Sequence, residues 1–150
     1  MTEWQWSSFN ELDIDALYAL LARRQEVFIL EQRCLYPDID ALDQRAYHLL
    51  GWQMRDGVRS LVAYLRCVEP GVKYPEPSLG RVLTVAAARG TGVGKALLEQ
   101  GIRHSGQQFP GQRIRISAQL YLERFYQEFG FRRCSQPYDE DGIPHVEMLR

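Results

Sequence analysis

A glycine-rich turn at residues 89–95 is the feature that most limits how this chain can fold. It follows an apolar, β-branched run at residues 81–85 and precedes a segment with helical spacing of apolar residues at 93–107. Glycine has no Cβ and adopts left-handed backbone conformations at little steric cost, so glycines at 90, 92 and 94 favour a tight change of direction. The segment therefore predicts a buried strand, a tight turn and a helix, in that order.

The same turn has the chemistry of an anion-binding site. The first N–H groups of a helix have no partner within the helix and carry a partial positive charge, and glycines let a phosphate approach them closely. Lys95 in the first helical turn opposes the helix dipole at a cost of about 0.3–1 kcal/mol, which a bound anion would offset. The same reasoning covers Arg89. The alternative is a turn whose glycines serve backbone geometry only.

Two well-known phosphate-binding motifs do not match this turn. The GxxxxGK[ST] motif requires Ser or Thr after Gly94 and Lys95, where this chain has Ala96. The GxGxxG motif of dinucleotide-binding folds needs a third glycine at position 95 and an acidic residue near 110–116, and the chain has neither. If the turn binds a phosphate, it does so without either motif.

The remaining segments alternate between strand and helix patterns, with few linkers and no repeat. Asp56 and Gly57 are a preferred pair for a tight hairpin turn between two strands. The expected strands are residues 4–6, 47–54, 60–68, 81–85, 113–117, 131–134 and 145–149. The expected helices are one that ends near residue 30, one at 93–107 and one at 122–129, closed by Gly130. This order predicts an α/β fold, and 150 residues suit one domain, 1–150.

The first expected helix begins at a cap, either Asn10 or Asp13. Its apolar residues recur at helical spacing and form one face. They are Ile14, Leu17, Leu20, Leu21, Val27 and Phe28. Arg24 and its charged neighbours are expected to face solvent, and the acid-rich segment 37–43 that follows is expected to be a loop.

Charge is distributed unevenly along the chain. The net charge is −1, which argues against a general nucleic-acid binder. Residues 81–133 hold nine Lys or Arg and three Glu, a balance of +6, so the rest of the chain carries −7. This segregation indicates an anion-binding central region, although solvated arginines scattered over the surface would give the same count.

Cysteine usage and hydropathy restrict the class of protein. Cys34, Cys67 and Cys134 are odd in number and lack zinc-ligand spacing, so we expect neither a disulfide framework nor a metal site. No run of 18 apolar residues is present, and the N-terminus lacks a basic region followed by an apolar run. These features predict a cytoplasmic protein that is not bound to a membrane.

Two motifs resemble those of a known superfamily. Arg89, Gly92 and Gly94 match the pattern (Gln/Arg)-x-x-Gly-x-(Gly/Ala) between a strand and a helix. Residues 125–131 (FYQEFGF) match a second element, in which a short helix ends in Tyr-x-x-x-Gly-Phe. With the order of elements, these motifs resemble the GNAT superfamily of acyl-CoA-dependent N-acyltransferases. Two further patterns, at 24–34 and 140–145, resemble its ElaA-like branch.

The resemblance implies an architecture and a cosubstrate site. The fold would be a single mixed central sheet flanked by helices, with strands splayed at the acyl-CoA site. The backbone of Leu83, Thr84 and Val85 would bind the pantetheine arm of acetyl-CoA. The pyrophosphate would bind to the turn formed by Arg89, Gly90, Thr91, Gly92, Val93, Gly94 and Lys95. Gln119 stands where many members have an asparagine that contacts pantetheine, and its amide offers the same donors and acceptor.

The resemblance also implies direct attack of an amine on the thioester, with no covalent enzyme intermediate. Tyr126 is then the candidate general acid for the departing thiolate, against the alternative of a core tyrosine. Glu31, His48 and His145 are candidate bases, although a lone histidine is usually structural and ordered water is a further alternative. Cys34 has no base paired with it and is excluded as a nucleophile.

The acceptor is not identified by the sequence beyond a small-molecule or peptide amine. One hypothesis is that acidic residues attract a cationic acceptor, and the other is that they lie in solvated loops. They are Asp38, Asp40, Asp43, Asp139, Glu140 and Asp141. Three alternatives to an N-acetyltransferase stay open: a non-catalytic acyl-CoA-binding sensor, a structural module without a CoA site, and an acyl-homoserine-lactone synthase. A homodimer is compatible with each of them.

Overall fold

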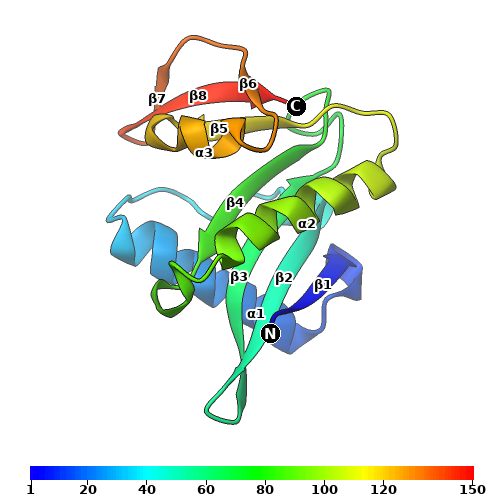
Figure 1. Ribbon diagram of the computed structural model, residues 1–150, viewed down its shortest axis with the longest axis vertical. Coiled ribbons are helices and arrows are strands. Elements are labelled where there is room, and N and C mark those ends of the chain that lie inside the picture. The colour runs from blue at the N-terminus through cyan, green and yellow to red at the C-terminus, as the bar shows by residue number, and fades with distance from the viewer.

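A single open sheet of eight strands, flanked by helices, forms the centre of the molecule (Figure 1). The computed structural model describes all residues 1–150. Seven strands follow the order β1-β2-β3-β4-β5-β8-β6, and β7 pairs with β8. The strands are β1 (Glu3–Ser8), β2 (Ala46–Arg55), β3 (Val58–Val68), β4 (Ser78–Thr84), β5 (Arg115–Gln119), β6 (Arg132–Arg133), β7 (Tyr138–Glu140) and β8 (Ile143–Leu149). Only β4 and β5 run parallel, so the expected mixed sheet is confirmed.

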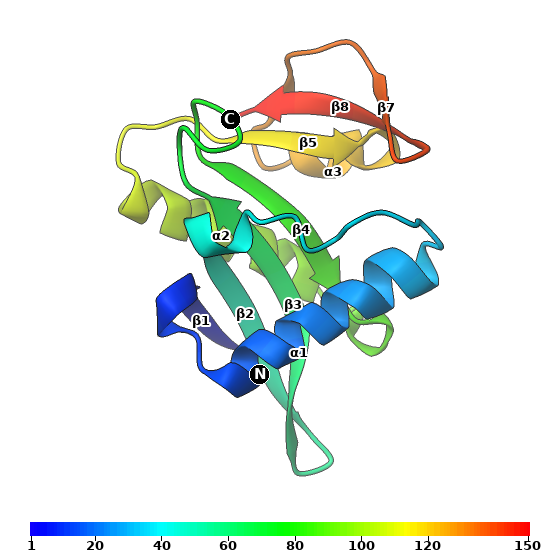
Figure 2. The same cartoon turned by 180° about the vertical axis from the view of Figure 1, so that it is seen from behind.

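The helices cover both faces of the sheet (Figure 2). α1 and α2 lie on opposite faces of the part formed by β1–β4, and α3 lies beside β5 on the same side as α2. The helices are α1 (Ile14–Arg24), η2 (Gln25–Glu31), α2 (Val93–Gln108) and α3 (Glu123–Gln127), with short 3-10 turns η1 (Phe9–Glu11), η3 (Asp43–Arg45), η4 (Ala86–Ala88) and η5 (Leu120–Leu122). One core cluster packs the sheet against α2 and α3, and a second packs it against α1. None of the helices combines the length and the apolar character needed to span a membrane.

The sheet opens between β4 and β5. These strands share a single register pair, Ser78 with Arg115, supported by the Arg115 N–H bonded to the Pro77 carbonyl at 3.0 Å. Every residue of β5, by contrast, pairs with β8. Beyond Ser78 the two parallel strands diverge, and the splay that the resemblance implied is confirmed.

A bulge interrupts β4 on its other edge. Tyr64 pairs with Leu83 and Arg66 with Gly80, so two residues of β4, Arg81 and Val82, stand opposite one residue of β3. Arg81 has a left-handed backbone, with φ of 50°. The strand also begins at Ser78, earlier than the expected 81–85, because Pro77 and Gly80 hide its start in the sequence pattern.

The first helix differs from its expected form in two ways. Asp13 is its cap, with the side chain accepting from the Ala16 N–H at 2.7 Å, and after Arg24 the α-helix continues as the π-helix η2 to Glu31. The expected faces are wrong at two positions, since Ile14 is 84% exposed and Arg24 is fully buried. Ile14 is the first residue of α1, next to its cap, and Arg24 is buried because acidic side chains meet it.

The C-terminal half follows the expected order with shifted boundaries. The expected helix at 122–129 is divided into η5 and α3, and Gly130 closes it with φ of 90°. α2 ends at Gln108, within one residue of expectation, whereas β5 covers 115–119 instead of 113–117. β7 was not expected, because three residues in an acidic segment carry no apolar alternation.

Two glycines of α2 provide a matched test of packing between this helix and the sheet. Gly106 faces open space, so Gly106→Ala should raise the free energy of unfolding by about 0.5–1 kcal/mol through helix propensity. A Cβ at Gly101 would lie 2.7 Å from Leu65 Cδ2 in the core, so Gly101→Ala should lower the free energy of unfolding by up to about 2 kcal/mol. Denaturant unfolding measures both, and an equal gain in the two variants would contradict this close packing.

Candidate active site

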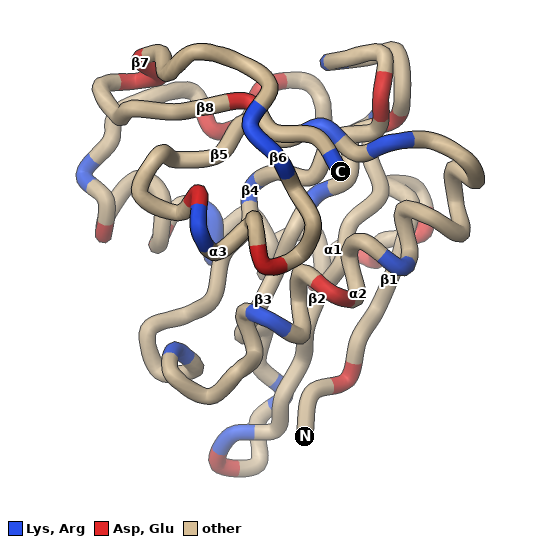
Figure 3. Tube along the Cα trace, turned by 45° about the horizontal axis from the view of Figure 1, so that its top comes forward, with Lys and Arg blue, Asp and Glu red and all other residues tan.

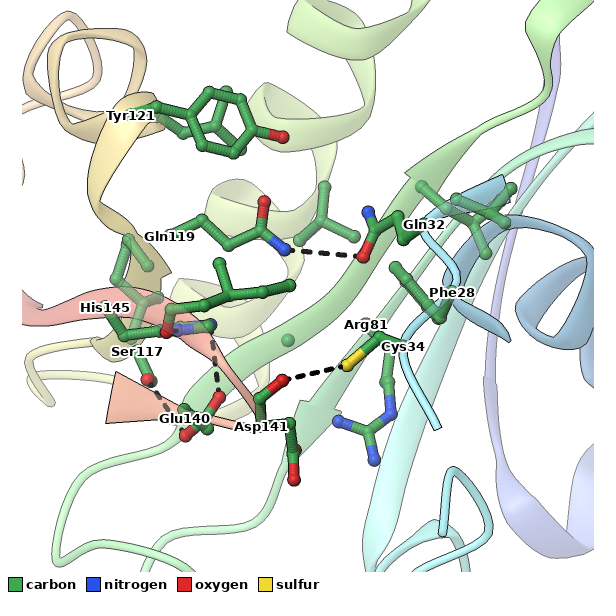
Figure 4. A pocket seen from close by; sticks show the side chains of 18 of the residues that line it. Phe28, Gln32, Cys34, Arg81, Ser117, Gln119, Tyr121, Glu140, Asp141 and His145 are labelled. Carbon is green, nitrogen blue, oxygen red and sulfur yellow. Dashed lines mark hydrogen bonds and ion pairs between the residues drawn. The ribbon is translucent and has the colours of Figure 1, made fainter. Parts of the chain in front are cut away.

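A cavity of about 610 Å³ occupies the opening between β4 and β5 (Figure 4). Its walls come from both sides of the sheet. β4 contributes Leu79, Gly80, Arg81, Val82, Leu83 and Thr84, and β5 contributes Ile116, Ser117, Ala118 and Gln119. The α1 side adds Val27, Phe28, Glu31, Gln32, Cys34 and Tyr36, and the α3 side adds Tyr121, Leu122 and Tyr126. The gap in the sheet is thus a passage lined from both faces.

The glycine turn lies beside one end of this cavity. Gly90 and Gly92 have left-handed backbones, with φ of 78° and 87°, and Gly92 is the N-cap of α2. A Cβ at either would meet nothing within 4 Å, and one at Gly94 would lie 3.8 Å from Thr84 Cγ2. The first N–H groups of α2 therefore face an open surface next to the end of β4, which fits a phosphate ligand.

The two cations of the turn have protein partners. Arg89 donates from Nη2 to the Thr84 carbonyl and to Glu31 Oε2, both at 2.8 Å. Lys95 is exposed, with Nζ 3.6 Å from Glu128 Oε2. Arg89 thus fixes the end of β4 to η2, and Glu31, a candidate base, is held in an ion pair.

The predicted cosubstrate residues divide by position. Leu83, Thr84, Arg89 and Gln119 line the cavity. The turn residues 90–95 follow Arg89 along the chain and do not line the cavity. Val85 does not line it either, because it is buried, and its N–H is bonded to the Val62 carbonyl at 2.9 Å. Gln119 ends β5. Its side-chain nitrogen Nε2 lies 3.5 Å from the side-chain oxygen Oε1 of Gln32 across the cavity.

Tyr126 lies in the wall of the cavity on α3. Its side chain packs edge-on against Phe125 and Phe131, and the residue is only 7% exposed. Burial raises the pKa of the Tyr126 phenol to about 12, so the hydroxyl is protonated at neutral pH. It has no hydrogen-bond partner in the protein, which leaves its proton available to a ligand in the cavity.

His145 and Glu140 form a polar group on the opposite wall (Figure 4). His145 donates from Nδ1 to the Ile143 carbonyl at 2.7 Å, and its Nε2 lies 3.2 Å from Glu140 Oε2. The other Glu140 oxygen accepts from Ser117 Oγ at 3.4 Å, and Ser117 also bonds the Tyr138 hydroxyl. Both ring nitrogens of His145 therefore face oxygen acceptors.

His48 lies outside the cavity, so the structure does not bring it together with the other candidate bases. The side chain is fully buried between the Tyr64 hydroxyl, 2.7 Å from Nδ1, and the Asp43 carbonyl, 2.9 Å from Nε2. Burial lowers the pKa of His48, and a neutral ring that donates to the carbonyl and accepts from the tyrosine satisfies both contacts. His48 has a structural role.

The three aspartates of the acid-rich loop are paired with arginines. Arg24 binds Asp38 at 2.9 Å and Asp43 at 2.7 Å. Arg66 binds Asp40 at 2.7 Å and Asp43 at 3.0 Å. The network is completed by Arg81, from the β4 bulge, at 2.8 Å from Asp38 and 3.2 Å from Asp40. Burial favours the neutral form of Asp40, but the hydrogen bonds and charge of Arg66 outweigh it and lower the pKa of this carboxyl to about 2.

Several residues of the cavity were not identified from the sequence. Tyr121 and Arg81 have no motif, and Arg81 resembles an ordinary strand residue. Gln32 lies in the pattern at 24–34 but was given no role in the site. Cys34, which was excluded as a nucleophile, lines the cavity and donates from Sγ to the Asp141 carbonyl at 3.2 Å. No group of three or more His, Cys, Asp or Glu side chains is placed to hold a metal ion.

Comparisons with known proteins bear on the family and the fold of this chain. A family model described as an acetyltransferase (GNAT) domain matches residues 23–150. A UPF0039 protein of Synechocystis sp. is 46% identical over 146 residues, 97% of this chain and 93% of that protein. The crystal structure of an acyl-CoA N-acyltransferase from Pseudomonas aeruginosa has a TM-score of 0.93 at 37% identity and covers 100% of this chain and 99% of that one. Escherichia coli ElaA has a TM-score of 0.91 at 38% identity, with the same coverage.

The arginine–aspartate network predicts an unequal response to loss of an arginine. Arg24→Met removes one of the two arginine partners from each of two largely buried carboxylates, Asp38 and Asp43, so it should lower the free energy of unfolding by up to about 3–5 kcal/mol. Arg45→Met removes an exposed pair with Glu69 and should cost less than about 1 kcal/mol. Urea unfolding followed by circular dichroism compares them, and similar losses in both variants would show that the network does not support the fold.

Proposed function

Because this chain belongs to the GNAT acetyltransferase family, we propose that it transfers an acetyl group from acetyl-CoA to a primary amine of a small molecule or peptide, by direct attack in a ternary complex. The observation that carries the proposal is the cavity between β4 and β5, which has the helix N-terminus beside one end and the protonated Tyr126 in its wall. Its lining from both faces of the sheet gives room for a cosubstrate from the α2 side and an acceptor from the α1 side.

The edge of β4 supports binding of the pantetheine arm. Beyond Ser78 this edge has no neighbouring strand, so backbone N–H and C=O groups that point toward β5 are unpaired within the sheet. A pantetheine arm carries two amides and can pair with such an edge as an added strand would. The residues proposed for this contact are Leu83, Thr84 and Val85, with Gln119 on the opposite strand.

The start of α2 supports binding of the pyrophosphate. Residues 90–95 present backbone N–H groups without side chains in the way, and the helix dipole favours negative charge there. Lys95 is exposed beside them, and Arg89 holds the turn against Thr84. We infer that Arg89 shapes this turn in addition to supplying charge.

Tyr126 is the proposed general acid. As the amine attacks the thioester carbonyl, the C–N bond forms, the C–S bond breaks and the thiolate needs a proton. The Tyr126 hydroxyl is protonated and free of protein partners, so it is suited to donate that proton. Charge develops only as the sulfur departs, so the contribution of this group belongs to the transition state.

Two candidate bases remain in the cavity wall, and each is already engaged. Glu31 has to release Arg89, and His145 has to release Glu140, before either takes a proton from the amine. Ordered water that carries the proton to solvent is the third route. A non-catalytic acyl-CoA sensor is the second candidate function, because it would use the same binding surface and leave Tyr126 without a chemical role.

The cosubstrate site can be tested at Gly94, whose backbone is helical and without strain. Gly94→Glu places a negative side chain on the N–H groups at the start of α2, so it should abolish micromolar binding of acetyl-CoA. Gly94→Ala adds a methyl group with ordinary contacts only and should retain binding. Calorimetric titration measures both, and binding by the glutamate variant equal to that of the unaltered protein would place the pyrophosphate elsewhere.

The acid role can be tested separately from binding. Tyr126→Phe should lower kcat for amine-dependent thiol release by about 10²–10⁴-fold, with little change in the affinity for acetyl-CoA. A thiol-reactive dye gives the rate, and calorimetry gives the affinity. Unchanged turnover would remove Tyr126 from the mechanism, and acetyl-CoA binding without turnover of any amine would favour the sensor.

A further inference from the structure

We propose that the acceptor is zwitterionic, an amino acid or a similar compound, with its ammonium group at Asp141 and its carboxylate at Lys73. The inference rests on the proposed acetyl transfer and names the substrate class for the same cavity. It comes from the charged side chains that line the cavity, among which Asp141 and Lys73 form no ion pair with another residue.

The pairs account for most of these charges. Glu31 is bound to Arg89 at 2.8 Å, and Glu140 lies 3.2 Å from His145. Arg81 is held by Asp38 and Asp40, behind the cavity wall. Asp141 and Lys73 line the cavity as well, and neither forms an ion pair with any residue of the chain. A ligand with one positive and one negative group would neutralise both.

Asp141 is the acidic residue that the network leaves free. Of the six acids considered from the sequence, three are neutralised by arginines, and Glu140 lies 3.2 Å from His145 Nε2. Asp139 accepts from the Gly142 N–H at 3.1 Å, within the β7–β8 turn where the acidic residues gather (Figure 3). The backbone of Asp141 is fixed at the cavity by the Cys34 thiol, which donates to its carbonyl at 3.2 Å. Its carboxylate accepts no hydrogen bond from the protein and can receive one from an ammonium group.

Lys73 is exposed and forms no ion pair within the chain. Partial burial lowers the pKa of its ammonium group, and the nearby charges of Glu140 and Asp40 oppose that shift. It lies on the connection between β3 and β4, where the Gly71 N–H bonds the Tyr74 carbonyl at 2.7 Å. Its Nζ lies 5.4 Å from the centre of the Tyr74 ring, a contact that leaves the N–H donors free. Tyr36 and Ser117 also line the cavity, and their hydroxyl groups are engaged with Asp38 and with Tyr138 and Glu140, respectively.

The two charges also restrict the mode of binding. An amine without a carboxylate would leave Lys73 unpaired, and a carboxylic acid without an amine would leave Asp141 unpaired. The contact with Asp141 favours the ammonium form, so it acts in binding, and a base has to remove the proton before attack. Lys73 and Asp141 are thus specificity-determining residues and take no part in the bond changes.

The test compares each amino acid with its methyl ester, which keeps the ammonium group and loses the carboxylate. Acetyl transfer is measured on the twenty proteinogenic amino acids and β-alanine, each beside its ester. The best acceptor should exceed its ester by about tenfold or more in kcat/KM, as expected for one charge-assisted hydrogen bond. Lys73→Met should bring the acid-to-ester ratio of kcat/KM close to one, because KM for the acid rises while kcat is retained. Asp141→Asn should raise KM for both the acid and the ester.

A charge reversal sharpens the result. Lys73→Glu should favour diamines, in which a second ammonium group replaces the carboxylate, over the matching amino acids. Arg103→Met, on the exposed side of α2, serves as the control and should leave every ratio unchanged. Esters equal to or better than acids in the unaltered protein, or an acid-to-ester ratio that survives in Lys73→Met, would overturn the inference.

Binding separates failure of this inference from failure of the proposed function. If acetyl-CoA binds but no amine is acetylated, the transferase proposal fails, and the inference is then decided by calorimetric titration of the same amino acids into the protein–CoA complex. Binding that is lost in Lys73→Met and absent for esters would support a zwitterion site. The absence of binding by any of these amino acids would overturn it.

Discussion

The separation of β4 from β5 is the constraint on which the rest of the structure depends. A parallel pair inside a sheet normally continues its hydrogen bonds along both strands, and unpaired backbone groups that are shielded from water are unfavourable. Here the pairing stops after Ser78 and Arg115. The remaining edge of β4 faces a cavity instead of a strand, so the molecule carries a backbone surface suited to a ligand with amide groups. The glycine turn and α2 follow directly from the end of that strand and extend the same surface to an anion.

Each side of the opening is held by a different interaction. On the α1 side, three arginines and three aspartates bind the acid-rich loop to α1, β3 and the β4 bulge. Buried ion pairs contribute little net stability compared with apolar residues, but they specify geometry. The Arg81 backbone, left-handed without being glycine, is retained by its side chain at Asp38 and Asp40. On the other side, apolar packing of Tyr126 against Phe131 places α3 beside β5.

The parts of the fold that local patterns determine were predictable from the sequence. The turn at Gly90 and Gly92 and the start of α2 at Val93 were expected from glycine and helix-end chemistry, and the family resemblance supplied the splay. The burial of Arg24, the partners of Asp43 and the position of His48 were not predictable, because each depends on charges brought together from distant segments. Apolar periodicity predicts that the Arg24 side chain faces solvent. Only the three-dimensional structure shows the aspartates that pair with it. The roles of Tyr126 and of the glycine turn in binding and catalysis stay predictions.

The narrow end of the opening, at Ser78 and Arg115, is held by different interactions from its wide end. Arg115 is bound to Glu76 and to Glu147, both at 2.9 Å. Its side chain therefore links the point where β4 and β5 meet to β8, which holds Glu147, and to the loop before β4, which holds Glu76. At the far end, the two halves of the sheet are joined across the cavity by the amide contact of Gln32 with Gln119 and by the thiol contact of Cys34. The Ser78–Arg115 pair is therefore the point from which the two strands diverge toward Gln119. The two halves of the molecule are thus joined by backbone pairing at the narrow end of the opening and by side-chain contacts at its wide end.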